Sequence, residues 1–216
     1  MQRPGKTGIR NAILLAAAML FLTAPAVSQE SNDPWGTLEN VRTSMLKAGP
    51  VSATFSTTDV PEGSSKGETE SGRVAIALPG CIRWDYQQPS QKSFLVCDGM
   101  AYYWNNEDGN GSRNPIDYAQ EPALSFFLVD LDFLKKYYSA SGRPVSRGLE
   151  ILLILKGAAD LDQGAVITVD PKSKRIVEVS YRMGGNLTRF VIGQFGPLGN
   201  RNLFSPPQGI RWTDGN

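Results

Sequence analysis

The chain contains no histidine. Most general bases and most zinc sites use this side chain, so its absence argues against a hydrolase or a zinc enzyme. The sequence also lacks a G-x-S-x-G nucleophile elbow, a C-x-x-C pair and a glycine-rich phosphate loop. We therefore expect no catalytic residue, no metal ion and no cofactor. The acidic pair Asp160 and Asp162 is expected to lie on a solvated turn rather than to hold a metal.

Long hydrophobic runs are scarce. One uncharged apolar run of 11 residues, 12–22, follows three basic residues and precedes several small ones. It is too short for a membrane-spanning helix, which needs about 20 residues. The pattern is typical of a secretory signal peptide. We predict a signal peptide over residues 1–28, cleaved after Ser28 or after Ala26, and export of a soluble protein to the periplasm.

Cysteine is also scarce, with only Cys81 and Cys97 in the chain. Neither is next to the predicted cleavage site, so no lipid anchor is expected. Removing residues 1–28 leaves 188 residues and changes the net charge from +1 to −2. This length indicates one domain, residues 29–216, with a sizeable core. The charge does not favour nucleic acid as a partner, and we expect a monomer.

Three amphipathic helices are predicted. Residues 34–48 place apolar side chains on one stripe, with Asp33 as a possible cap and Gly49 at the end. Two shorter helices follow Pro122 and join near Val129 and Asp130.

Between these helices the period of the apolar residues changes to two, which is typical of strands. Strands are predicted over residues 51–57, 74–78, 82–86, 93–98 and 101–104, and again over 149–155, 165–170, 175–182 and 187–195. Tight turns between the first strands indicate an antiparallel meander. Residues 107–115 are polar and are predicted to form a loop.

The register of one hairpin can be predicted from its apolar residues. Pairing Ile82 with Val96 and Trp84 with Phe94 puts the large side chains on one face. The same register places Cys81 opposite Cys97, close enough for a disulfide. Two free thiols remain the alternative, although an oxidising compartment favours the bond.

Several segments carry a recognisable pattern. Residues 72–89 contain a strand, a Pro-Gly turn and the motif R-W-x-Y-x-x-P, and a D-G turn follows at Asp98. The C-terminal segment 204–209 reads F-S-P-P-Q-G. In this order, the motifs resemble the LolA family of outer-membrane lipoprotein carriers over nearly the whole exported chain.

The resemblance implies an α+β fold: an incomplete antiparallel β-barrel, or half-barrel, with a helical lid over a hydrophobic cavity. The cavity would hold the acyl chains of lipoproteins. An inner-membrane ABC release complex would deliver them and an outer-membrane acceptor would take them, without catalysis. Two departures from the family pattern stand out. Leu78 occupies a position where many members have a basic residue that latches the lid, and Phe55-Ser56-Thr57 replaces F-x-Q.

The predicted site has a wall and a lid. The wall residues of the lipid-binding cavity are Val74, Ile76, Ile82, Trp84, Tyr86, Phe94, Val96, Tyr102 and Trp104. The lid residues are Leu38, Val41, Met45, Leu124, Phe127 and Leu128, with Leu78 beside them. A filled core would give the same sequence pattern, and a register error of one residue would invert the assignment of faces.

Two other functions are compatible with the pattern. The first is a LolA-like sensor or regulator of the cell envelope that binds lipids, lipoproteins or a partner protein. Such proteins usually add a second domain or a membrane anchor, and neither is expected here. The second is an exported lipid-modifying enzyme, against which the missing histidine and nucleophile elbow argue. The sequence does not identify the cargo, the donor or the acceptor.

Overall fold

The computed structural model describes residues 33–105, 107–158, 164–199 and 201–215. These residues fall within one compact unit, Ser31–Asn216. The predicted signal peptide and the acidic pair Asp160 and Asp162 lie outside the described residues.

Helix α1 spans Pro34–Ala48, as predicted. Proline suits the first helical position because the amide hydrogen that it lacks would have no partner there. Asp33 occupies the cap position, but its side chain makes no capping hydrogen bond, so that part of the prediction is wrong. The backbone carbonyl of Asp33 instead accepts hydrogen bonds from the amide and the hydroxyl of Thr37, at 3.1 and 2.9 Å. The helix ends at Gly49, whose positive φ of 72° is favourable for glycine.

A proline begins one of the two short helices, and an aspartate caps the other. Helix α2 spans Pro122–Leu128 and helix α3 spans Leu131–Tyr137. The side chain of Asp130 caps α3 by accepting a hydrogen bond from the amide of Phe133 at 2.7 Å. The predicted junction near Val129 is therefore confirmed.

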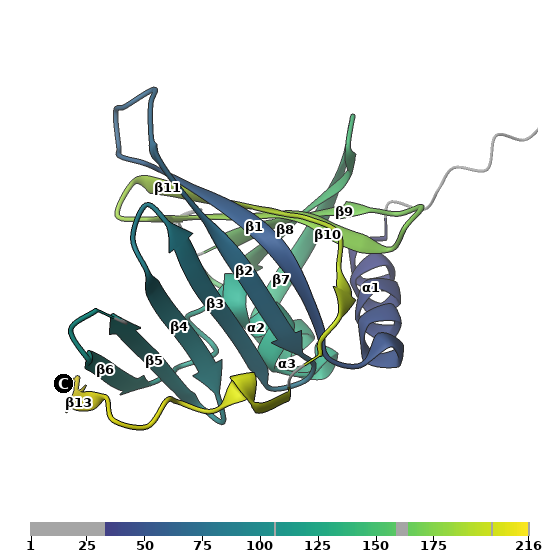
Figure 1. Cartoon of the computed structure of the whole chain (residues 1–216). Helices are drawn as coiled ribbons and strands as arrows, with labels where there is room; N and C mark the ends of the chain where they lie inside the picture. The colour runs from purple at the N-terminus through teal and green to yellow at the C-terminus, as the bar shows by residue number, and fades with distance from the viewer. Residues whose placement is uncertain (1–32, 106, 159–163, 200, 216) are drawn as a thin grey trace, which may run out of the picture. The chain divides into compact units, whose positions relative to one another are not determined.

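The described strands form one sheet (Figure 1). Their order is β13-β6-β5-β4-β3-β2-β1-β11-β10-β9-β8-β7, with β12 pairing beside β1. The first half of the sheet contains β1 (Val51–Val60), β2 (Glu68–Ala77), β3 (Cys81–Gln88), β4 (Lys92–Cys97), β5 (Met100–Asn105) and β6 (Asn110–Pro115). The second half contains β7 (Tyr138–Val145), β8 (Gly148–Leu155), β9 (Gly164–Asp170), β10 (Arg175–Met183) and β11 (Asn186–Ile192). The C-terminal segment adds β12 (Gly196–Pro197), a 3-10 turn η2 (Arg201–Phe204) and β13 (Arg211–Asp214).

The sheet is curved and does not close. Neighbouring strands are antiparallel except β13, which runs parallel to β6. The outermost strands, β13 and β7, are not paired with each other. Helix α2 contacts β3 in one half of the sheet and β8, β9 and β10 in the other. The sheet therefore curves around α2, which confirms the predicted half-barrel (Figure 1).

The main core lies on the concave face. The buried side chains of α1, α2 and α3 pack there against alternate residues of the strands, including Phe55, Ile76, Ile151 and Ile167. A smaller cluster lies on the convex face, where Leu95 and Trp104 pack under Phe204, Ile210 and Trp212 of the C-terminal segment.

Several elements differ from the sequence prediction, including the short C-terminal elements β12, η2 and β13, which were not predicted. Residues 110–115 form strand β6 rather than a loop, because their backbone pairs with β5 on one side and with β13 on the other. Strand β7 was not predicted. Its exposed, weakly apolar side chains carry little period-2 signal, and it forms by pairing with β8.

Candidate functional site

A cavity of about 340 Å³ lies between the concave face of the sheet and α2. Its lining is mostly apolar and draws on both halves of the sheet. The lining residues are of three groups. Strands β1 to β5, β10 and β11 contribute Phe55, Val74, Ile76, Ile82, Trp84, Tyr86, Phe94, Val96, Ala101, Tyr102, Val179, Tyr181, Arg182, Met183, Phe190 and Ile192. Strand β9 contributes Gly164, and α2 with the two residues before it contributes Gln120, Glu121, Pro122, Ala123, Leu124 and Phe127. Such a mixture of aromatic and aliphatic groups with a few polar ones is typical of small-ligand sites.

Aromatic rings connect the two halves of this lining. Phe55 of β1 lies between Tyr86 and Phe190, with ring centroids 5.0 and 5.9 Å away. Tyr86 also contacts Phe94 at 5.7 Å, and Phe190 contacts Tyr181 at 6.4 Å. Edge-on, tilted and offset arrangements are the favoured ways for aromatic rings to pack. These contacts therefore join β3 and β4 to β10 and β11 through Phe55 of β1.

The structure places most of the predicted wall around this cavity. The hairpin register is the predicted one, with Ile82 opposite Val96 and Trp84 opposite Phe94. The predicted wall residues of β2, β3 and β4 all line the cavity: Val74, Ile76, Ile82, Trp84, Tyr86, Phe94 and Val96. That they bind lipid stays a prediction.

The prediction for β5 is wrong for Trp104. This side chain lies in the convex-face cluster, 6.2 Å from the ring of Trp212. Tyr102 borders the cavity, but its ring also packs against Trp212, at 5.4 Å. The reason is the turn, because Asp98 and Gly99 alone separate the paired ends of β4 and β5. A two-residue turn sets even positions of β4 opposite odd positions of β5, so Ala101 and Tyr103 share the concave face with Phe94.

Several lining residues were not predicted. Phe55, Tyr181, Phe190 and Ile192 come from β1, β10 and β11. Their strands carried the period-2 signal, and Phe55 alternates with serine and threonine. The sequence pattern did not reveal that β11 pairs with β1, a distant segment of the chain, with Phe55 opposite Ile192. That pairing brings the second half of the sheet to the cavity.

The helices contribute unequally to the predicted lid. Leu124 and Phe127 of α2 line the cavity. Leu128 is buried beside them but is not among the lining residues. The α1 residues Leu38, Val41 and Met45 are also buried in the core without lining the cavity, so α1 does not cover it directly. Leu78 packs against the core at the turn between β2 and β3 and does not reach the lining.

A buried arginine joins α1 to α2. The guanidinium of Arg42, which is only 6% exposed, donates hydrogen bonds to the backbone carbonyl oxygens of Phe126 and Val129, the latter at 2.6 Å. It also lies 5.5 Å from the ring centroid of Phe126. Burial lowers the pKa of Arg42, and the nearby carboxylate of Asp130 partly offsets this effect. We call this contact the Arg42 clasp. The helical pattern does not reveal this contact, because Arg42 lies off the apolar stripe of α1.

Three ionisable groups of the cavity lining have pKa values shifted towards their neutral forms. Burial, followed by the negative charge of Glu70, raises the pKa of the Tyr86 phenol. Burial also raises the pKa of Tyr181. The pKa of the Glu121 carboxyl is raised by burial and, to a smaller extent, by Asp117. The wall therefore offers a medium of low polarity to whatever occupies the cavity.

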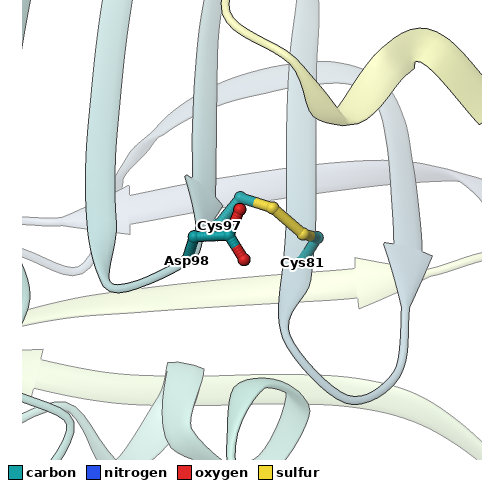
Figure 2. Close-up of side chains that lie close together, drawn as sticks. All are labelled: Cys81, Cys97 and Asp98. Carbon is teal, nitrogen blue, oxygen red and sulfur yellow. A yellow bond between two sulfur atoms is a disulfide. The ribbon is translucent and has the colours of Figure 1, made fainter.

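Cys81 and Cys97 form a disulfide between β3 and β4, with their Cα atoms 4.3 Å apart. Asp98 lies beside the two sulfur atoms (Figure 2). Because each sulfur is bonded to the other, neither is available as a thiolate ligand for a metal. The bond fixes one end of the hairpin whose alternate residues, from Ile82 to Tyr86 and at Phe94 and Val96, line the cavity.

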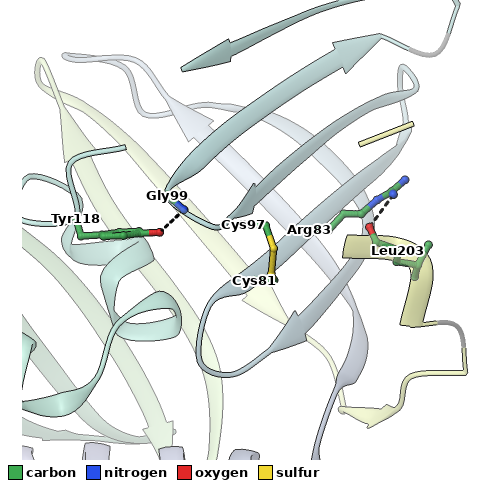
Figure 3. The surroundings of a disulfide bond; sticks show 6 residues. All are labelled: Cys81, Arg83, Cys97, Gly99, Tyr118 and Leu203. Carbon is green, nitrogen blue, oxygen red and sulfur yellow. Dashed lines mark hydrogen bonds between the residues drawn. A yellow bond between two sulfur atoms is a disulfide. The ribbon is translucent and has the colours of Figure 1, made fainter. Parts of the chain in front are cut away.

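The surroundings of the disulfide connect it to two other segments (Figure 3). Arg83 donates a hydrogen bond to the carbonyl oxygen of Leu203 at 3.0 Å and lies over the ring of Trp104. The amide of Gly99 donates to the hydroxyl of Tyr118 at 3.1 Å. The first contact holds the C-terminal segment to the convex face, and the second holds the chain that leads into α2.

No helix in the described part of the chain combines the length and apolar character needed to cross a membrane.

Comparisons with known proteins identify related sequences and folds. The family model of the outer membrane lipoprotein carrier protein LolA matches residues 47–196. No curated protein sequence matches the chain. An uncharacterized conserved protein from Thermus thermophilus is similar in structure, with a TM-score of 0.50 and 11% identity over 83% of this chain and 98% of that one. At this identity the likeness shows the fold alone.

Two further structures are similar at lower scores. The LolA superfamily protein NE2245 from Nitrosomonas europaea has a TM-score of 0.45 and 8% identity, over 79% of this chain and 96% of that one. MucB in the Pseudomonas aeruginosa MucA/MucB complex has a TM-score of 0.45 and 13% identity. That match covers 83% of this chain and 62% of the other.

Proposed function

The chain belongs to the LolA family of outer-membrane lipoprotein carriers, and from this premise we propose that it carries the acyl chains of lipoproteins through the periplasm. In this proposal an inner-membrane ABC complex supplies the cargo and an outer-membrane acceptor receives it. The signal peptide predicted over residues 1–28 would direct export. The role needs binding and release but no catalytic residue, metal or cofactor.

The observation that carries the proposal is the apolar cavity enclosed by Ile82, Trp84, Phe94 and Phe127. Burying a methylene group contributes about 0.8 kcal/mol, so a chain of about 15 methylenes costs roughly 12 kcal/mol to expose to water. A carrier must therefore offer a wall as apolar as the membrane interior. The neutral phenols of Tyr86 and Tyr181 suit this requirement.

The size of the cavity supports a movable lid. Its volume of about 340 Å³ is at the low end of the range for ligand sites, about 300–1,000 Å³. A lipoprotein carries more than one acyl chain, so the sheet and α2 would have to separate to admit them. Leu124 and Phe127 would then leave the sheet and contact the cargo instead.

The Arg42 clasp would hold the empty carrier closed. Its two hydrogen bonds run from α1 to carbonyl oxygens at the end of α2, and moving α2 away from the sheet would stretch or break them. The free energy of the clasp would then oppose loading and favour release. Arg42 would then act as the latch. Many family members have a basic residue for this role at the position of Leu78.

A lipoprotein-transfer assay tests the proposal. Inner-membrane vesicles that contain the ABC complex and a labelled lipoprotein would be incubated with ATP and the purified protein, and the water-soluble complex measured. Wild type should release the lipoprotein into solution. The Ile82→Ser variant has a hydroxyl in the cavity wall, so it should bring little lipoprotein into solution.

The matched control is Leu95→Ser. Leu95 is as deeply buried as Ile82, at 0% against 1% exposed, and lies in the same hairpin but on the convex face. Both changes destabilise the fold, while only the first alters the cavity. Equal release by the two variants would contradict the proposal. Outer-membrane vesicles are added in a second step, and a soluble complex that does not pass its lipoprotein to them would favour a sensor instead.

A further inference from the structure

The concave face of the sheet continues beyond the cavity, over β4, β5 and β6. A second hollow of about 450 Å³ lies there. It shares Phe94, Ala101 and Tyr102 with the lining of the cavity. The two hollows therefore border the same side chains and lie next to each other.

The second hollow differs from the cavity in its chemistry. Lys92, Tyr103, Ser112 and Asn114 bring an ammonium group, a phenol, a hydroxyl and an amide to its lining. The strand register explains their common face. Tyr103 is opposite both Phe94 and Ser112, and Asn114 is opposite Ala101. We call this hollow, defined by these four residues, the polar groove.

The charge of Lys92 is already balanced. Its Nζ lies 2.8 Å from a carboxylate oxygen of Glu70 and 4.8 Å from the ring centroid of Tyr86, which also lines the cavity. These contacts fix the ammonium group at the junction of the two hollows. Because Glu70 compensates the charge, the polar groove does not require an anion. Ammonium, phenol, hydroxyl and amide groups can all donate hydrogen bonds to uncharged acceptors.

An acylated molecule has such acceptors at a fixed place. The ester or amide carbonyl follows directly on the last methylene of each acyl chain, so chains held in the cavity put their carbonyls near its end. A carbonyl that is removed from water without a hydrogen-bond partner destabilises the complex. A groove of donors next to an apolar cavity avoids this cost.

We propose that the polar groove binds the ester and amide carbonyl groups that join acyl chains to the polar part of the cargo. The inference rests on the proposed carrier function. It assigns a binding site to the carbonyl groups of the cargo, which lie outside the cavity that holds the acyl chains. The same diacylglyceryl ester chemistry occurs in lipoproteins and in phospholipids, so the test must distinguish these two sources.

The experiment measures displacement of a fluorescent fatty acid from the whole protein by three probes. The probes are a dipalmitoylglyceryl-cysteine peptide, dipalmitoyl phosphatidylglycerol, and an ether-linked phosphatidylglycerol with chains of the same length but no ester carbonyl. The test variant combines Tyr103→Phe, Ser112→Ala and Asn114→Ala, which remove three donors and leave the cavity wall intact. The control variant combines Tyr137→Phe with Ser141→Ala, outside both hollows.

Wild type and control should bind the ester-linked probes about tenfold more tightly than the ether-linked probe, because each hydrogen bond to a carbonyl increases the binding constant a few-fold. The test variant should lose this preference and keep its affinity for the ether-linked probe. A larger loss for the lipopeptide than for the phospholipid identifies a lipoprotein as the source of the carbonyls, and the reverse identifies a phospholipid. An unchanged preference, or an equal loss for all three probes, would overturn the inference. Failure of wild type to bind any probe would instead contradict the carrier function itself.

Discussion

Replacing Arg42 with methionine tests whether the clasp is a latch. Methionine keeps the apolar part of the side chain and removes the guanidinium that donates to the carbonyls of Phe126 and Val129. Each hydrogen bond to a charged group contributes about 1.5–3 kcal/mol, but relief from burying the charge offsets part of the loss. We expect the empty protein to lose about 2 kcal/mol of unfolding free energy.

The loss should depend on the cargo. If the clasp opens on loading, the substitution destabilises only the empty state, and the affinity for acyl chains rises by the same free energy. A change of about 2 kcal/mol corresponds to roughly 30-fold tighter binding. Release of the acyl chain to an acceptor should be slower by a similar factor, because the closed empty state that follows release is less stable in the variant.

The assay combines urea unfolding, with and without saturating fatty acid, and titration with a fluorescent fatty acid. Arg42→Lys is the control, because lysine keeps a charge and hydrogen-bond donors at this position and should behave more like wild type. Equal destabilisation of the empty and loaded protein, with unchanged affinity, would refute the latch. Arg42 would then only hold the core together.

Three further predictions follow from the site. Replacing both Cys81 and Cys97 with serine should lower the unfolding free energy by roughly 3 kcal/mol, measured by urea unfolding without reductant, and an unchanged midpoint would contradict a stabilising disulfide. Leu78→Arg should supply a basic group beside the lid, weaken retention and speed transfer of acyl chains to acceptor vesicles; a folded variant with an equal or slower rate would show that Leu78 has no part in release. The pKa of the Glu121 carboxyl is raised in the folded state, so ionisation of this group destabilises the fold. The unfolding free energy should therefore fall as pH rises from the unfolded-state pKa through the folded-state pKa. Glu121→Gln should therefore raise the melting temperature at pH 8 more than at pH 4, and equal shifts at both pH values would argue against this account.

The local structure could be predicted from the sequence because short-range signals determine it. Helix α1 has the predicted bounds, since a proline begins it and Gly49 ends it. The hairpin register followed from matching large apolar residues, and it placed Cys81 opposite Cys97. The same matching of paired positions determines which residues of β5 lie on the concave face. The two-residue turn at Asp98 and Gly99 puts Trp104 on the convex face, and the prediction failed because it did not carry the register across that turn.

Long-range features could not be predicted in this way. The pairing of β1 with β11 joins distant segments, and their alternation shows that they are strands without showing which strand is the neighbour. The clasp depends on where α2 sits relative to Arg42, a residue that lies off the apolar stripe of α1. Strand β6 is polar and forms because β5 and β13 both pair with it. In each case one decisive partner is far away along the chain: β11 for β1, α2 for Arg42, and β13 for β6.

The most direct test of the central claim is intact mass spectrometry of the protein purified from the periplasm without detergent. If the cavity carries acyl chains, a fraction of the molecules should have the mass of the protein plus an acylated lipoprotein or lipid. Ile82→Ser should lose this species and Leu95→Ser should keep it. Wild-type protein purified only in the unbound form, in cells that are actively exporting lipoproteins, would contradict the account.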